Sequence, residues 1–227
     1  MLVIGFRIGA HLEGNVTMAG DSDAIELINM FPVPLLMQAE ERADLNRRFV
    51  AEALVRRGKE AGVDRSNRYG WHSNADFFQR KEEAHTELAE IIRQFVQKAT
   101  KQMMPKLPGD LAPSCEGWVN INPTHALNSP HDHPGSFWSG TYYAQVPLPT
   151  REEDKMSGAI EFLDPRGSLG TSARIETPFT RSKFTLRPAA GTLLLWPGYL
   201  RHWVYPNMSK EDRFTVSFNA WYSRPKS

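Results

Sequence analysis

Apolar residues change their spacing close to residue 113. Before that point they recur at helical intervals in two stretches, 39–57 and 77–104. A linker rich in helix-breaking residues follows: Pro105, Pro108, Gly109 and Pro113. Beyond it, apolar and polar residues alternate, as they do in strands with one buried face. The pattern therefore predicts two helices followed by a β-region.

Eight short extended stretches make up the predicted β-region. They span 115–122, 129–133, 137–146, 158–164, 182–187, 191–196, 200–206 and 212–222. A series of this length is typical of a double-sheet jelly roll, the double-stranded β-helix. We therefore predict a mainly β fold of two facing antiparallel sheets, with the two N-terminal α-helices packed on the outside of one sheet. The strand aromatics are expected to be mostly core: Trp118, Phe137, Tyr142, Phe162, Trp196, Phe214 and Phe218.

The same change of period predicts the domain organisation. Residues 1–25 are poorly patterned and are expected to form an N-terminal extension. Residues 26–113 form a helical N-terminal region, which opens on an extended edge element at 26–38. Residues 114–227 form the double-stranded β-helix core. A chain of 227 residues suits one domain with extensions, so we expect 26–227 to form one folded unit.

Composition and charge narrow the class of protein. A hydrophobic content of 41% supports a real core, and a formal net charge of +1 gives no argument for nucleic acid or anionic membranes as partners. One cysteine, Cys115, excludes an internal disulfide framework and suits a reducing compartment. No apolar run reaches the roughly 20 residues of a membrane span, and the apolar start lacks the features of a signal peptide. A cytoplasmic location is therefore expected, while the oligomeric state is not predicted.

The triplet His131-Asp132-His133 is the first candidate for chemistry. Histidines two positions apart on an extended segment point to the same side, so they can offer two imidazoles to one metal ion. His202, in a late strand, can supply a third ligand and leave other positions of the metal open. We predict a metal site of His131, His133 and His202.

A basic residue follows the last of these histidines. In the run 213–219, Arg213, Thr215 and Ser217 share one strand face, where a guanidinium and a hydroxyl can hold a carboxylate. Asn120 and Asn122 share a face of the first strand and can donate amide hydrogen bonds to the same ligand. Together they predict an anionic co-substrate beside the metal.

Several segments resemble the 2-oxoglutarate/Fe(II) oxygenase family related to prolyl 4-hydroxylases. They are 70–77, 120–143, 158–166, 191–197 and 213–219, and the resemblance covers roughly residues 27–223. It implies a double-stranded β-helix that uses Fe(II) and, as co-substrate, 2-oxoglutarate, whose far carboxylate pairs with Arg213. It does not imply a particular substrate, which is expected to be a small molecule or a peptide.

The resemblance also distributes roles over the candidate residues. It implies metal ligands at His131, His133 and His202; co-substrate contacts at Arg213, Thr215, Asn120, Asn122 and Tyr143; and a substrate pocket shaped by Trp138, Tyr142 and Arg166. One departure stands out, because the wider superfamily usually has a carboxylate where this chain has His133. On a regular strand Asp132 points away from the face of His131, so it would replace His133 only through a bulge.

Two other kinds of protein stay open. A cupin-like dioxygenase also uses three histidines, without a co-substrate, but its pattern places a glutamate shortly after the triplet, where Phe137 and Trp138 stand. A non-catalytic binding module would hold a structural zinc with no open position. Three nitrogen ligands do not by themselves select iron over zinc.

Overall fold

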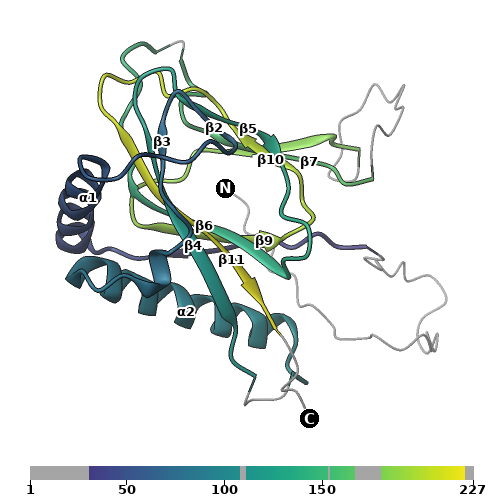
Figure 1. The fold of residues 1–227 in the computed structure, drawn as a ribbon. Coiled ribbons are helices and arrows are strands. Elements are labelled where there is room, and N and C mark those ends of the chain that lie inside the picture. The colour runs from purple at the N-terminus through teal and green to yellow at the C-terminus, as the bar shows by residue number, and fades with distance from the viewer. Residues whose placement is uncertain (1–30, 108–110, 153, 167–179, 223–227) are drawn as a thin grey trace, which may run out of the picture. The chain divides into compact units, whose positions relative to one another are not determined.

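In the computed structural model, which describes residues 31–107, 111–152, 154–166 and 180–222, the strands form two antiparallel sheets. The first has six strands, in the order β1 (Leu36–Ala39), β9 (Thr192–Pro197), β6 (Trp138–Gln145), β11 (Arg213–Trp221), β4 (Ser114–Asn122) and β3 (Trp71–His72). The second has five, in the order β2 (Asn67–Arg68), β5 (Leu127–His131), β10 (His202–Val204), β7 (Ile160–Leu163) and β8 (Lys183–Leu186). The predicted mainly β, double-sheet fold is confirmed (Figure 1).

All eight predicted strands are present, with ends that differ by a few residues. Three more were not predicted as separate strands. β1 lies in the predicted edge element and pairs with β9, whereas β2 and β3 have two residues each, too few to show an alternation. These two short strands lie on either side of one turn and join different sheets, because β2 pairs with β5 and β3 with β4.

Both predicted helices are present and begin later than expected. Helix α1 spans Ala43–Arg57, since the residues just before it pair as β1. Helix α2 spans Glu83–Met103 and follows a short 3₁₀ helix, Phe77–Gln79. The N-terminus of α2 is held by α1, because the Glu52 carboxylate accepts hydrogen bonds from the backbone N–H groups of Ala84 (3.0 Å) and His85 (3.1 Å). None of the described helices is long and apolar enough to cross a membrane.

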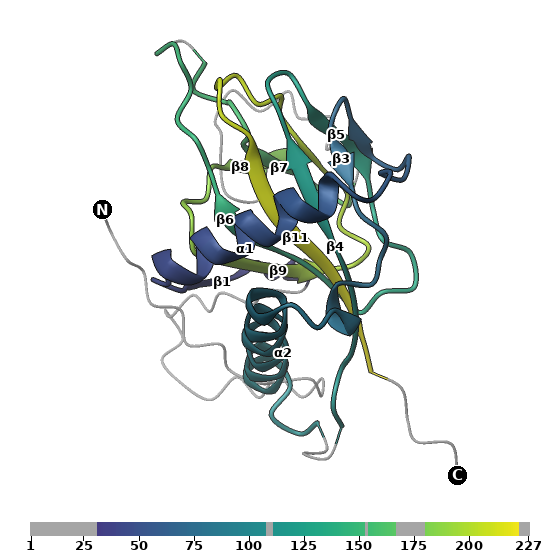
Figure 2. The ribbon, with the colours of Figure 1, turned by 60° about the vertical axis from the view of Figure 1, so that its left-hand side comes forward.

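Strand alternation gives the six-stranded sheet an outer, helix-covered face and an inner, polar one. Along β11, Phe214, Val216 and Phe218 pack with the helices in one core cluster. The intervening positions from Arg213 to Asn219 point the other way, toward the second sheet. Figure 2 shows α1 running across the outer face in front of β6, β11 and β4. This arrangement confirms helices packed outside one sheet and leaves the inner face for a site.

The core prediction is wrong for two of the seven strand aromatics. Phe137 is 43% exposed, because it lies in the turn before β6 rather than within the strand. Trp118 lines a pocket between the sheets. The remaining five are buried in the two core clusters.

The chain divides into two compact units, Met1–Pro32 and Val33–Ser227, and the fold above belongs to the second. The predicted extension at 1–25 and the first residues of the edge element lie outside the described residues. The predicted domain boundaries therefore stay predictions.

Candidate metal centre

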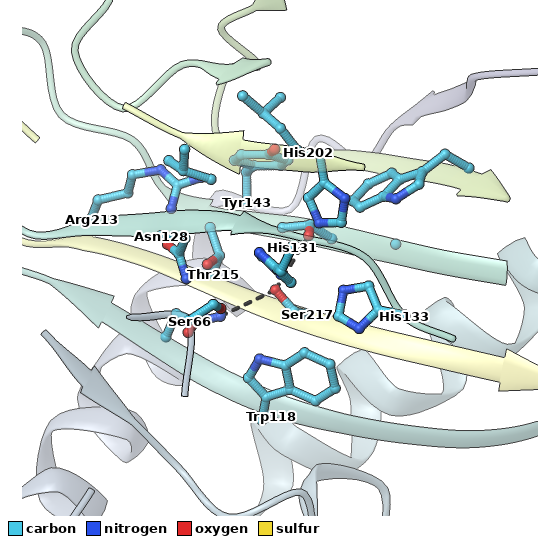
Figure 3. A pocket seen from close by; sticks show the side chains of 16 residues that line it. Ser66, Trp118, Asn128, His131, His133, Tyr143, His202, Arg213, Thr215 and Ser217 are labelled. Atoms are coloured by element: carbon cyan, nitrogen blue, oxygen red, sulfur yellow. Dashed lines mark hydrogen bonds between the residues drawn. The ribbon is translucent and has the colours of Figure 1, made fainter. Parts of the chain in front are cut away.

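Three histidines from two strands and a turn meet in the pocket between the sheets (Figure 3). β5 and β10 are neighbours, and His131 and His202 face each other in register with ring centroids 4.5 Å apart. His133 completes the group: one ligand atom from each of the three side chains lies within 4.8 Å of the other two. This separation allows all three to reach one metal ion from the same side.

His133 reaches the group by a different route from the one predicted. The expected strand 129–133 ends at His131, and His133 lies in the turn that follows. Its backbone N–H donates to the Gly198 carbonyl (2.9 Å), and its own carbonyl accepts from the Ser136 N–H (3.1 Å). Asp132 is exposed and is not part of the cluster. The turn therefore brings His133, rather than Asp132, to the side of His131.

The three imidazoles are neutral, so each can offer a ring nitrogen to a metal ion. Burial is the main cause that lowers their pKa values, to about 4 for His133 and about 3 for His202. In His131 and His202 the Nδ1–H donates to a backbone carbonyl two residues earlier, at 2.6 and 2.9 Å. This bond leaves Nε2 of both rings free as a ligand. Three neutral nitrogens fit a divalent transition metal and leave further positions open.

A buried cation that pairs with no carboxylate in the described part of the chain lies at the other side of the pocket. Arg213 is 2% exposed, and its Nε–H has no partner among the described residues. Its guanidinium carbon lies 5.1 Å over the ring of Tyr143, whose hydroxyl is also buried without a partner. Burial lowers the pKa of Arg213 and raises that of Tyr143 to about 12. The Tyr143 hydroxyl oxygen can accept from the guanidinium, but its own proton and the Arg213 Nε–H have no acceptor among the described residues, which is costly unless an anion accepts from both.

Gly158 makes room for the arginine stem. It has φ +63°, and a Cβ there would stand 3.2 Å from Arg213 Cδ. We expect Gly158→Ala to lower the free energy of unfolding by about 1–2 kcal/mol for the left-handed backbone, plus a further loss for the displaced arginine. Gly135→Ala is the matched control, since Gly135 has φ +84° and open space around it. Urea denaturation of both variants measures the difference, and equal losses would show that the contact with Arg213 has no energetic weight.

The other predicted co-substrate residues divide into two groups. Thr215 and Asn120 line the pocket, and Asn120 Nδ2 donates to Ser217 Oγ on β11 (3.1 Å). Asn122 does not line it. Its Nδ2 donates to Asn128 Oδ1 (3.2 Å), so its amide is already hydrogen-bonded outside the pocket.

The three residues expected to shape the substrate pocket, Trp138, Tyr142 and Arg166, are not among the residues that line the pocket between the sheets, and their role at the substrate stays a prediction. Trp138 and Tyr142 sit on the outer face of β6, because alternation turns only the intervening positions inward. There, Trp138 Nε1–H donates to Thr100 Oγ1 of α2 (2.8 Å), and the Tyr142 hydroxyl donates to the Asn46 side chain of α1. Arg166 is exposed and forms an ion pair with a neighbouring aspartate at 2.6 Å.

One wall of the pocket was missed in the sequence. Trp118 lies beside His133, with ring centroids 5.7 Å apart, and stacks on the buried ring of His72 (5.4 Å, 15° between planes). The signal was available, because Trp118 shares the inward face of β4 with Asn120. Polar side chains from both sheets complete this wall: Ser66, Asn128, Thr141 and Ser217.

The comparison with protein families matches the part of the chain that carries these residues. Residues 116–219 match the family model described as "Putative 2OG-Fe(II) oxygenase". This segment includes the three histidines, Arg213 and Tyr143. The match agrees with the resemblance seen in the sequence. A search of curated proteins gives no match.

Solved structures with this fold include several oxygenases. A Pseudomonas putida prolyl-4-hydroxylase has a TM-score of 0.57 at 16% identity, covering 85% of this chain and 93% of that one. A Trichoplax adhaerens prolyl hydroxylase, in complex with a hypoxia inducible factor peptide fragment, has a TM-score of 0.57 at 11% identity, covering 82% and 83%. The epimerase SnoN, in complex with Fe³⁺, alpha ketoglutarate and nogalamycin RO, has a TM-score of 0.56 at 16% identity, covering 82% and 78%. At these identities the likeness establishes the fold.

Proposed function

We propose that this chain, whose residues 116–219 match the 2OG-Fe(II) oxygenase family model, is an Fe(II)- and 2-oxoglutarate-dependent oxygenase of the hydroxylase type. The observation that carries the proposal is the pairing of two features in one pocket. One is a group of three neutral histidines, and the other is a buried arginine that pairs with no carboxylate of the described residues. A metal cation satisfies the first, and a dicarboxylate that also reaches the metal satisfies the second.

Each residue has a role that follows from its surroundings. His131, His133 and His202 hold Fe(II), and the backbone carbonyls behind two of them fix the rings. Arg213 and the Tyr143 hydroxyl donate to the far carboxylate of 2-oxoglutarate, with Thr215 and Asn120 as further polar contacts in the lining. When bound, iron and 2-oxoglutarate together supply dioxygen activation by oxidative decarboxylation to succinate and carbon dioxide.

The substrate belongs beside Trp118, which lies next to His133. The described lining there is aromatic or neutral and hydrogen-bonding, which suits a small molecule or a peptide side chain. Proteins with this fold have been solved with a hypoxia inducible factor peptide fragment and with nogalamycin RO. With a net charge of +1, nucleic acid is not part of the proposal. A cytoplasmic location is part of the proposal, and the free thiol of Cys115 supports it.

Succinate release tests the proposal. Protein purified without metal is loaded anaerobically with Fe(II), given 2-oxoglutarate and dioxygen, and assayed for succinate with and without candidate substrates. We expect slow release without substrate and faster release with a correct one. Oxidation of a substrate with no need for 2-oxoglutarate would instead support the three-histidine dioxygenase. One tightly held zinc with no 2-oxoglutarate binding would support the binding module.

Tyr143→Phe should keep or raise the stability of the metal-free protein but lower its affinity for 2-oxoglutarate. Without ligands, it removes a buried unpaired hydroxyl, so the metal-free protein should be as stable as wild type or up to about 1 kcal/mol more stable. With ligands, it removes one donor to the carboxylate, so 2-oxoglutarate affinity should fall about 5- to 30-fold. Thermal unfolding and calorimetric titration measure the two. A stability loss with unchanged affinity would remove Tyr143 from the co-substrate site.

A further inference from the structure

We infer that Asn219, itself anchored by Ser139, is the positioning residue that orients His133 as a metal ligand. The inference rests on the metal centre of the proposed function. It starts from a difference among the three rings. His131 and His202 each donate from Nδ1 to a carbonyl of their own strand or turn, which no side-chain substitution can remove. His133 Nδ1 instead faces Asn219 Nδ2 at 3.4 Å, so its ring depends on a side chain.

Asn219 is held in place from behind. Ser139 on β6 and Asn219 on β11 are register partners, and Ser139 Oγ donates to Asn219 Oδ1 at 2.7 Å. Both side chains are buried, at 1% and 7% exposure. Asn219 also shares the inner face of β11 with Arg213. One strand face therefore supports the co-substrate site near its start and the third metal ligand near its end.

The backbone of His133 is already fixed, which leaves the ring as the variable part. Its N–H donates to the Gly198 carbonyl, and Gly198 lies so close to the turn that a Cβ would stand 2.3 Å from the Ser136 carbonyl oxygen. The His133 ring packs against the rings of Trp118 and His202, with centroid distances of 5.7 Å and 5.4 Å. These contacts restrict its tilt but give no hydrogen-bond direction. Asn219 supplies that direction.

The amide suits this task because it can serve either form of the ring. In the structure the chain of hydrogen bonds runs from Ser139 through Asn219 to an unprotonated His133 Nδ1. A ring that binds metal through Nε2 carries its proton on Nδ1 and needs an acceptor there. A half-turn of the amide presents Oδ1 to His133 and Nδ2 to the Ser139 hydroxyl, which can also accept. Metal binding then reverses the direction of these two hydrogen bonds and keeps both contacts, Ser139 to Asn219 and Asn219 to His133.

Metal affinity, measured without turnover, tests the inference. Co²⁺ is titrated against a competing chelator, with absorbance as the readout. Asn219→Leu, which removes both functions of the amide, should weaken Co²⁺ binding about 10- to 100-fold. Asn219→Asp restores an acceptor and should keep the affinity within about threefold of wild type. Ser139→Ala removes the hydrogen bond that anchors the Asn219 amide, so its Co²⁺ affinity should lie between the affinities of the two Asn219 variants. Thr100→Val is the matched control and should keep the wild-type Co²⁺ affinity, because it removes a buried hydroxyl that accepts from Trp138, the residue before Ser139, on the outer face of β6 and outside the pocket.

A second measurement separates orientation from general loosening of the fold. In zinc-loaded protein with ¹⁵N-labelled histidine, all three rings should be protonated at Nδ1. In Asn219→Leu and Ser139→Ala, only the His133 Nδ1 proton should exchange faster with water. Wild-type Co²⁺ affinity in a folded Asn219→Leu or, should that variant not fold, unchanged exchange in Ser139→Ala would overturn the inference and leave the proposed function standing. Failure of the wild type to bind any divalent metal would overturn both.

Discussion

His131→Ala and His202→Ala should each abolish stoichiometric iron binding and leave the fold intact. Losing one of three ligands should cost more than about 100-fold in affinity, the upper end of what removal of an outer partner costs. The fold should persist because the helices and the six-stranded sheet share a core that does not include the histidines. Metal analysis after anaerobic reconstitution and a circular dichroism spectrum give the two readings. Wild-type iron content in either variant would refute the metal centre.

Three further variants complete this experiment. His125→Asn is the matched control, because His125 is an exposed histidine in the left-handed region, where asparagine is tolerated. It should keep the full iron content. Asp132→Ala should also keep it, since Asp132 points to solvent, while His133→Ala should not. The reverse order for the last two would mean that Asp132 rather than His133 completes the site.

Arg213→Ala should weaken 2-oxoglutarate binding about 30- to 1,000-fold, or roughly 2–4 kcal/mol, and leave iron binding unchanged. The effect is large because the guanidinium is buried and no carboxylate of the described residues pairs with it. Arg213→Lys should recover only part of the loss, because an ammonium lacks the planar fork. Calorimetric titration of manganese-loaded protein under anaerobic conditions measures both.

The control for this prediction is a second arginine, Arg57, which pairs with the residue just before Arg213. Arg57 forms an exposed ion pair with Asp212 (2.8 Å), the residue before Arg213. Arg57→Ala removes a guanidinium near the same strand end but outside the pocket, so 2-oxoglutarate affinity should not change. Equal losses in Arg57→Ala and Arg213→Ala would point to a general disturbance of β11 instead of a carboxylate contact.

Period-2 alternation explains which parts of this molecule could be predicted from its sequence. It separates Phe214, which faces the helices, from Arg213 and Thr215, which face the pocket, so the fold and the basic end of the site follow from the pattern. The same rule assigns Tyr143 inward and Tyr142 outward. The expectation that Tyr142 shapes the pocket ignored this rule.

The features that this alternation does not predict depend on turns and on side-chain pairing across the sheets. His133 reaches the metal group from a turn whose position is set by Gly198, about 65 residues later, and no local periodicity records that contact. Asn122 sits on the correct face of β4, yet its amide is taken up by Asn128. Two-residue strands such as β2 and β3 carry no period at all. Tertiary contacts decide each of these cases.

The candidate site is divided between the two sheets. Arg213 and Tyr143 belong to the six-stranded sheet, and His131 and His202 to the five-stranded one. A metal-bound dicarboxylate held by the arginine is therefore a cross-brace between layers that otherwise meet through side-chain packing and side-chain hydrogen bonds such as Asn122 to Asn128. Its arrival should damp opening motions of both layers at once, so that amide deuterium uptake slows together in β5, β10 and β11. Metal alone should slow it chiefly in β5 and β10, which makes the co-substrate a mechanical part of the folded protein as well as a reactant.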